Sequence, residues 1–260
     1  MQRLVFVPVF LVLVLTCCAL ISLVVKLDAE LNGRMLTDPE IRFALCLSFA
    51  TSLFPLCVSI LIALPSAWAM TRLAFPGKWL FNLLLDMPMV TPPLVTGMGL
   101  LLLLGNQGPV SGIAPWISAN LFSPLGIIIA QSYVASSILI RSAMSSFASI
   151  DTNYVLTGYN LGLPPWKTFF LIEIPLCWRQ LAGGCVLALS RCLGEFGATL
   201  MLAGATRMKT ETLPMAVYLN IASGDFSAAI ACACILIASA SILLLLIHWF
   251  QKPGLPPCSR

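Results

Sequence analysis

Six long apolar blocks constrain this chain more than any other feature of its sequence. Each block holds about 20 or more residues with few charges, which is the length that an α-helix needs to cross the hydrocarbon core of a bilayer. Only helices and closed β-barrels satisfy their backbone in lipid, and these blocks lack the alternation of barrel strands. The sequence therefore predicts an all-α integral membrane protein, a six-helix bundle with spans at residues 4–25, 43–70, 80–104, 122–140, 181–202 and 226–250.

The composition supports a membrane protein and argues against other classes. Charged residues make up 9% of the 260 positions, against about a quarter in soluble domains, so a water-soluble fold could not cover its surface. The ten cysteines lie almost all inside apolar blocks, where cysteine behaves as a small hydrophobe, and no metal-ligand spacing accompanies them. We expect no metal site, no cofactor and no nucleic-acid partner, and a lipid bilayer as the surroundings.

The connecting segments predict a topology. With a cytoplasmic N-terminus, the inner segments hold eight Lys and Arg residues and the outer segments five, which favours cytoplasmic N- and C-termini in the cell membrane. The first block is longer than a signal-peptide core and lacks an Ala-x-Ala cleavage pattern, so we expect it to be retained. The chain then divides into a first helix with an outer loop, residues 1–41, a transmembrane domain, 42–250, and a short tail, 251–260.

The inner loop at residues 141–180 is the most informative connecting segment. Asp151 is placed to cap a short helix, and Gly162 follows that helix as a C-terminal signal. Pro165 can open a second helix, because proline is tolerated in a first helical turn, and Pro175 is expected to stop it. We therefore expect two short helices on the cytoplasmic side.

Three aromatic residues share one face of this second helix. Trp166, Phe169 and Phe170 stand at positions i, i+3 and i+4. Such a face has two interpretations: it lies in the lipid interface, or it docks in a groove on a partner protein. The spacing alone slightly favours the lipid interface.

Three motifs in and near the apolar blocks resemble those of known transporters. They are Asp86-Met-Pro88-Met-Val-Thr-Pro92-Pro93, Arg191-Cys-Leu-Gly194-Glu195-Phe-Gly197-Ala-Thr199 and Thr210-Glu-Thr-Leu-Pro214-Met-Ala-Val-Tyr218. In this order they are similar to motifs of the molybdate permease family, and sulfate permeases share parts of all three. The resemblance covers roughly residues 42–250. It implies the fold of a type I ABC importer permease and an oxyanion cargo: molybdate, with tungstate or sulfate as alternatives.

The inner loop resembles the EAA loop of ABC importer permeases at Gly162, Pro165, Trp166, Phe169 and Phe170. In those proteins the second helix of the loop inserts into the ATP-binding subunit, so the resemblance assigns ATPase coupling to these residues and reverses the preference for lipid. The acidic signature residue of the loop is absent, because Leu156 holds its position. The resemblance further implies two copies of an ABC ATPase subunit, an external solute-binding protein and a homodimer of the permease.

Charged and proline residues inside the blocks have physical interpretations of their own. Arg191 and Glu195 stand four residues apart in one predicted helix, and each would be costly alone in the membrane. Between an ion pair that locks the bundle and a pathway or gate element we favour the pair, because a neutralised cation attracts an anion poorly. The prolines of the third block must break backbone hydrogen bonds, so we expect a kinked helix along the path. The path or gate residues are predicted to be Asp86, Pro88, Pro92, Pro93 and Thr199.

Two rival classes remain. A transporter driven by an ion gradient needs titrating carboxylates in the membrane, and Asp86 and Glu195 are the candidates. An intramembrane enzyme needs catalytic residues, but the spans hold neither His-Glu-x-x-His nor Gly-x-Ser-x-Gly. The chain also lacks the phosphate-binding loop Gly-x-x-x-x-Gly-Lys-Ser/Thr, so an ATP-driven mechanism requires a separate ATPase chain. We expect a transport subunit without catalytic residues.

Overall fold

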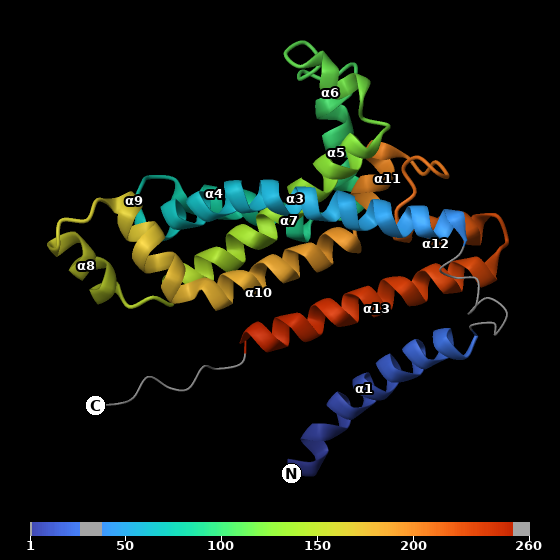
Figure 1. Cartoon of the computed structure of the whole chain (residues 1–260), viewed down its shortest axis with the longest axis horizontal. Coiled ribbons are helices and arrows are strands. Elements are labelled where there is room, and N and C mark those ends of the chain that lie inside the picture. Colours follow the sequence, from blue (N-terminus) through green and yellow to red (C-terminus); the bar gives the residue numbers. More distant parts are fainter. Residues whose placement is uncertain (1, 27–37, 252–260) are drawn as a thin grey trace.

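The computed structural model describes residues 2–26 and 38–251, and these are almost entirely helical, with no strand (Figure 1). Five helices are long and apolar enough to cross a membrane, and a bent pair of shorter helices brings the number to six if the pair counts as one span. The predicted all-α membrane fold is confirmed. The five long helices are α1 (Gln2–Val25), α3 (Pro39–Arg72), α7 (Pro124–Ala148), the continuous helix Pro165–Leu193, and α13 (Phe226–Gln251).

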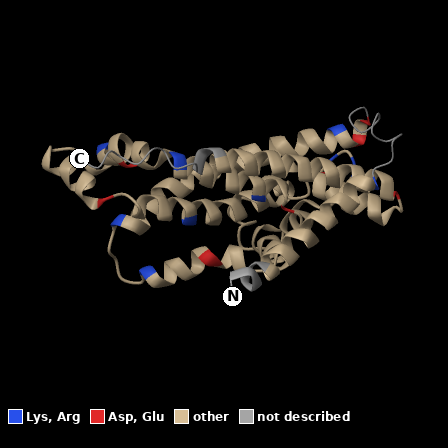
Figure 2. Ribbon diagram, turned by 90° about the horizontal axis from the view of Figure 1, so that it is seen from below, with Lys and Arg blue, Asp and Glu red and all other residues tan. Residues whose placement is uncertain are grey.

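The long helices lie side by side, and short helices occupy both ends of the bundle. Figure 1 shows α3, α7, α10 (Ile174–Leu193) and α13 along one axis, with α1 beyond α13. One end carries α8 (Thr152–Asn160) and α9 (Pro165–Thr168). The opposite end carries α11 (Gly197–Ala203) and α12 (Leu213–Ala222). The short helix α6 (Pro115–Ala119) lies in a separate projection that continues α5 (Pro93–Leu104). Charged residues are sparse along the helices (Figure 2).

Small side chains form the centre of the bundle. In the main core, between α3, α7 and α10, the residues Ala63, Ala67, Ala135, Ala143 and Ala188 are each at most 1% exposed. Small residues let helices approach closely, which is how helices gain van der Waals contact in lipid. The described side chains of α1, in contrast, are exposed nearly throughout, as expected of a helix whose apolar surface faces lipid.

Two predicted features near the inner loop are wrong. The fourth span was expected to end at residue 140, but α7 continues to Ala148, so Arg141 lies inside a helix. Pro175 was expected to stop a helix, but the chain stays helical through it. A π-helical turn, η1 (Phe169–Glu173), precedes Pro175, in which the N–H of Ile174 donates to the carbonyl oxygen of Phe169. The wider turn accommodates the proline ring, and Pro175 occupies the first turn of α10.

The predicted outer loop after the first helix and the predicted tail lie largely outside the described residues. The predicted first domain, 1–41, is described only at 2–26 and 38–41, and residues 252–260 of the tail are not described. The division into a first helix, a transmembrane domain and a tail therefore stays a prediction.

Candidate functional site

The third span is broken in the middle by two consecutive prolines. The helix α4 (Lys78–Val90) ends at Val90, α5 (Pro93–Leu104) begins at Pro93, and the two helices are bent by 114°. Neither Pro92 nor Pro93 has an N–H to continue the hydrogen-bond ladder of α4, whereas Pro93 is well suited to the first turn of a new helix. The expected kink is thus a complete break.

A second break separates α10 from α11, and the expectation that Arg191 and Glu195 lie mid-helix is wrong. The helix α10 ends at Leu193 with Gly194 as its C-cap, and α11 begins at Gly197. Oε1 of Glu195 accepts a hydrogen bond from the N–H of Ala198 at 3.0 Å, which satisfies a free donor at the start of α11. The carboxylate of Glu195, which was predicted to lie inside a regular helix, therefore caps the start of α11 instead.

Gln131 of α7 secures the end of α10, and sequence reasoning missed it. Its side chain is 1% exposed, and its Nε2 donates to the carbonyl oxygen of Cys192 at 3.0 Å. Carbonyls in the last turn of a helix have no partner within the helix, so this bond removes the cost of burying one. The signal available in the sequence was a glutamine in a predicted span, where an amide needs a hydrogen-bond partner.

The two breaks lie against each other. A Cβ atom added to Gly197 would lie 2.7 Å from Cβ of Pro93 and 3.0 Å from the backbone N of Leu94, so only glycine permits this approach. A pocket of about 320 Å³ opens at this junction. It is lined by Pro92, Pro93, Leu94, Arg191, Gly194, Glu195, Phe196 and Gly197. Of the predicted path residues, Pro92 and Pro93 reach this pocket, whereas Asp86, Pro88 and Thr199 do not line it.

Arg191 and Glu195 form an ion pair beside the pocket. Nη1 of Arg191 lies 2.8 Å from Oε2 of Glu195, with side chains 37% and 0% exposed respectively. The carboxylate is thus fully buried between a guanidinium and a backbone N–H, and the arginine keeps part of its surface open. Thr199 lies one turn further along in α11, fully buried, and its hydroxyl has no hydrogen-bond partner in the described structure.

Asp86 is held by a second arginine, which sequence reasoning counted with the loops. Arg141 of α7 makes two hydrogen bonds to the carboxylate of Asp86, one of them from Nη2 at 2.6 Å. Nη2 also donates to the backbone carbonyl of Asn82 at 2.6 Å. This bidentate pair ties α4 to α7. Both predicted intramembrane carboxylates are therefore paired with arginine.

The inner loop contains a short exposed helix, α8, whose two caps follow the predicted signals. The side chain of Asp151 accepts a hydrogen bond from the N–H of Asn153 at 3.0 Å. At the other end, Gly162 has a φ of +81°, its N–H donates to Tyr159, and the N–H of Leu163 donates to Gly158. These two bonds form a Schellman motif.

Phe169, one of the three rings predicted to form a docking face, is partly buried and packs against the bundle. It contacts the rings of Trp68 and Phe147, with centroid distances of 6.1 Å and 5.7 Å. Trp166 and Phe170 are 62% and 60% exposed. Together with Pro165 and the α3 residues Ile60, Leu61, Leu64, Pro65 and Trp68, the three rings line an apolar groove of about 750 Å³.

Glu173, at the end of η1, is a buried carboxylate that sequence reasoning did not select. It is 0% exposed, and its Oε2 accepts a hydrogen bond from Nε of Arg72 at 3.0 Å. Its Oε1 accepts from Nε1 of Trp68 at 3.0 Å. The signal in the sequence was a lone acidic residue inside a segment of aromatic and aliphatic residues. Its partners, about a hundred positions earlier in the chain, gave no such signal.

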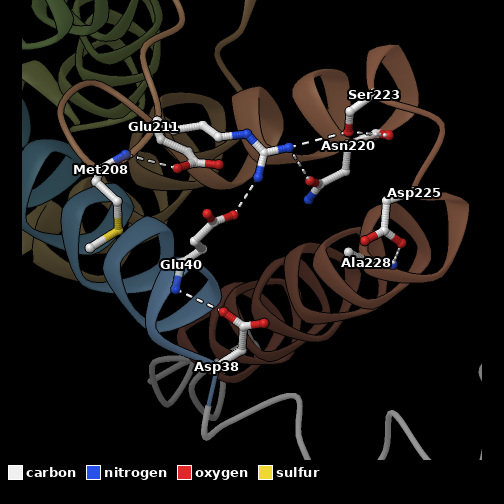
Figure 3. A network of polar contacts seen from close by, with 9 residues as sticks. Asp38, Glu40, Met208, Glu211, Asn220, Ser223, Asp225 and Ala228 are labelled. Atoms are coloured by element: carbon white, nitrogen blue, oxygen red, sulfur yellow. Dashed lines mark hydrogen bonds and ion pairs between the residues drawn. The ribbon is translucent and has the colours of Figure 1, made fainter.

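At the opposite end of the bundle, a polar network includes Glu40, Asn220 and Ser223 (Figure 3). Arg207 contacts all three of these residues. Its guanidinium pairs with Glu40 at the start of α3 and donates to Asn220 and Ser223 at the end of α12. Glu211, in the same loop, is fully buried and accepts a hydrogen bond from the N–H of Met208 at 3.0 Å. Burial raises the pKa of the Glu211 carboxyl, and this hydrogen bond opposes the rise.

None of these polar clusters is built like a metal site. Within the described residues no group of three or more His, Cys, Asp or Glu side chains could hold a metal ion. The carboxylates of Asp86, Glu195 and Glu173 are instead each paired with an arginine, and that of Glu173 also accepts a hydrogen bond from Trp68. The ion pairs of Asp86 and Glu173 hold neighbouring helices together, and that of Glu195 lies at the pocket between the two breaks.

Comparison with known proteins identifies the family. Residues 59–252 match the model of the binding-protein-dependent transport system inner membrane component. The chain belongs to this family. The molybdenum transport system permease protein ModB of Escherichia coli K12 is 33% identical over 84% of this chain and 96% of its own length. ModB of Mycobacterium tuberculosis H37Rv is 29% identical over 94% of this chain and 93% of its own length. The sulfate transport system permease protein CysT of Escherichia coli K12 is 27% identical over 94% of this chain and 88% of its own length.

Solved structures show the same fold. A chain in the crystal structure of a bacterial alginate ABC transporter, in complex with a periplasmic protein, aligns with a TM-score of 0.72 over 96% of this chain and 94% of its own. Its sequence identity is 12%, so this likeness concerns the fold alone. The resemblance inferred from the three motifs is confirmed, and the chain is a multi-pass membrane subunit of a transport system.

Proposed function

We propose that this permease carries molybdate across the cell membrane as the membrane subunit of an ATP-driven importer. The observation that carries the proposal is the junction of the two broken helices, with Arg191 at its pocket, in a chain that aligns along most of its length with molybdenum permeases. Broken helices inside a membrane protein are tolerated where they line a path for a solute. Tungstate and sulfate are the alternative cargoes, and sulfate is supported by the match to CysT.

The energy source is ATP hydrolysed by a separate subunit. The chain has no phosphate-binding loop, so it cannot itself bind ATP in that way. We place two ATPase copies at the end of the bundle that carries α8, where Tyr154, Leu156 and Leu161 are 57%, 50% and 77% exposed. The predicted docking residues Trp166, Phe169 and Phe170 lie beside α8, line one groove and form part of the same contact. The termini then lie on the cytoplasmic side.

The other end of the bundle faces an external solute-binding protein in this proposal. Two copies of the permease form the complete path, and alternating closure of the ATPases opens it to either side of the membrane. The loop around Arg207 lies at the outer end, where it would meet the binding protein. The permease performs no chemical step, because its polar groups only bind and orient.

An ion-gradient mechanism fits the described polar groups less well. A proton-coupled carrier needs a carboxylate that takes up and releases protons. Asp86 and Glu195 are each engaged in an ion pair with an arginine. Both pairs therefore serve structure better than proton transfer.

Reconstitution in liposomes tests the proposal. The permease is combined with its ATPase and a loaded binding protein, and uptake of radiolabelled molybdate is followed with ATP inside and an uncoupler present. We expect uptake that requires both ATP and the ATPase. Parallel assays with tungstate and sulfate rank the cargoes. Uptake by the permease alone, driven by an imposed pH gradient, would contradict the proposal.

A further inference from the structure

Three elements meet at the side chain of Glu173. The carboxylate itself belongs to η1, and both of its oxygens accept hydrogen bonds from α3, from Arg72 at 3.0 Å and from Trp68 at 3.0 Å. Arg72 extends the contact to α7, because its Nη2 donates to the carbonyl oxygen of Phe147 at 3.1 Å. Phe147 is the penultimate residue of α7. One buried carboxylate thus fixes the cytoplasmic ends of two spans to the start of a third.

The same turn supports α8. Gly158 of α8 lies so close to the helix Pro165–Leu193 that an added Cβ would be 2.7 Å from Cδ1 of Ile172 and 3.4 Å from Oγ1 of Thr168. Ile172 directly precedes Glu173, and Thr168 is 0% exposed. Continuous contact therefore runs from α8 through Ile172 to Glu173, and from Glu173 to α3 and α7.

The π-helical geometry of this turn needs support from its surroundings. An i→i+5 turn is rare and is found mostly as a single turn inside an α-helix, often at functional sites. Glu173 is the last residue of η1, and Phe169 at the other end packs against Trp68 and Phe147. Both ends of the turn thus contact α3, and they reach α7 as well, Phe169 directly and Glu173 through Arg72.

We propose that Glu173 is a positioning residue of the coupling region: with Arg72 and Trp68 it holds α8 in a fixed relation to α3 and α7, so that movement of α8 moves the spans. This inference rests on the proposed function, in which an ATPase acts on α8. The distant break at α4 is connected to the same helix, because Arg141 ties α4 to α7.

Stability alone does not account for a charged pair at this place. A buried ion pair loses its hydration, and well-packed apolar residues of similar volume are often at least as stabilising. The two hydrogen bonds from Trp68 and Arg72, one to each carboxylate oxygen, in contrast fix the orientation of the helices as well as the distance between them. The geometry is therefore suited to transmitting motion.

Three variants separate positioning from folding. Glu173→Gln keeps the size of the side chain and an acceptor for Trp68 but removes the charge that holds Arg72. The double variant Arg72→Leu with Glu173→Leu removes both charges, so that no unpaired charge stays buried. Arg179→Leu is the matched control, since it removes an exposed arginine from the same continuous helix.

Two measurements are made on each purified complex in liposomes. The first is the number of anions taken up per ATP hydrolysed, with molybdate as the probe. The second is the distribution of distances between spin labels at Tyr159 of α8 and Leu73 at the end of α3, introduced as labelled non-natural amino acids because the chain has ten cysteines.

In Glu173→Gln and in the double variant, we expect the number of anions transported per ATP to fall by about fivefold or more relative to the wild type. A change of this size is typical of a lost coupling between sites. Their distance distributions should broaden, whereas Arg179→Leu should match the wild type in both measurements. A double variant with wild-type anions per ATP and a narrow distribution would overturn the inference, whatever its folded yield. A wild-type complex without ATP-driven uptake would contradict the proposed function instead, and the distance measurement would still judge the role of Glu173.

Discussion

A Cβ atom on Gly197 would lie 2.7 Å from Cβ of Pro93, so the first turns of α11 and α5 meet backbone to backbone. The sequence motif containing Gly197 and the one containing Pro93 are about a hundred residues apart, and the fold joins them at the point where both spans are interrupted. The contact makes glycine a requirement of the junction and gives it a direct test.

Gly197→Ala should separate the two breaks. The added methyl group must displace Pro93 or Leu94, and overpacking of this kind costs about 1–3 kcal/mol. We expect a lower thermal unfolding temperature in detergent and slower anion uptake. Gly99→Ala in α5 is the control, because a Cβ atom there meets nothing within 4 Å. Equal behaviour of the two variants would show that the close contact does not matter.

The pair Arg191 and Glu195 should be strongly coupled. Arg191→Leu leaves a fully buried carboxylate, and Glu195→Leu removes both the partner of Arg191 and the hydrogen bond to the N–H of Ala198. Each single variant should therefore lower the folded yield sharply. The double variant should recover part of the lost yield, because no unpaired charge stays buried. It should not recover the part caused by losing the hydrogen bond to the N–H of Ala198 at the start of α11.

The exposed pair of Arg207 and Glu40 provides the comparison for this cycle. Its side chains are 40% and 44% exposed, and exposed pairs typically contribute about 0–1 kcal/mol. We expect a coupling energy in that range for Arg207→Leu and Glu40→Leu in a double-mutant cycle. Strictly additive losses at Arg191 and Glu195 would mean that their ion pair contributes nothing.

Glu211 should make the stability of the protein depend on pH. Burial raises the pKa of its carboxyl above the value in the unfolded chain, so the folded state binds this proton more tightly. The stabilisation is complete below the unfolded pKa and is lost as the pH rises through the folded pKa. We expect the unfolding temperature to fall over this window in the wild type.

Glu211→Gln is the matching variant, because glutamine retains an acceptor for the N–H of Met208 and carries no charge. It should be more stable than the wild type above the folded pKa of Glu211, and its unfolding temperature should fall less with pH. Asp225→Asn serves as the control: this carboxylate also caps a backbone N–H, that of Ala228, but its residue is exposed. An unchanged pH profile in Glu211→Gln would exclude Glu211 as its source.

The sequence was sufficient where local signals determine the structure. Asp151 and Gly162 limit α8 as predicted, because a side-chain cap and a left-handed glycine act within a few residues. The consecutive prolines at 92 and 93 likewise interrupt the third span, since a missing N–H is a property of the residue itself. Such features need no knowledge of the rest of the fold.

Contacts between distant segments were beyond the sequence. Glu173 and Arg72 are 101 residues apart, and Arg141 and Asp86 are 55 apart, so no spacing rule connects either pair. The break after Gly194 depends on a carboxylate that turns back to Ala198 and on Gln131 from another helix. Helical spacing placed Arg191 and Glu195 on one face, but it gave no sign of the interruption between them.

Phe169 and Phe170 are adjacent in the sequence but should respond in opposite ways to substitution. The ring of Phe169 packs between Trp68 and Phe147, so Phe169→Ala leaves a cavity among aromatic rings. Loss of a fully buried phenylalanine ring costs about 3–5 kcal/mol, and Phe169 is partly buried, so we expect a smaller but clear loss. Phe170 is 60% exposed, so Phe170→Ala should leave the unfolding temperature nearly unchanged.

The measurement is thermal unfolding of each purified permease in detergent, together with the amount of ATPase that co-purifies. Phe169→Ala should lower the unfolding temperature, and Phe170→Ala should change only ATPase retention. A stable Phe169→Ala variant that has lost its ATPase would support the docking role predicted from the sequence for this ring.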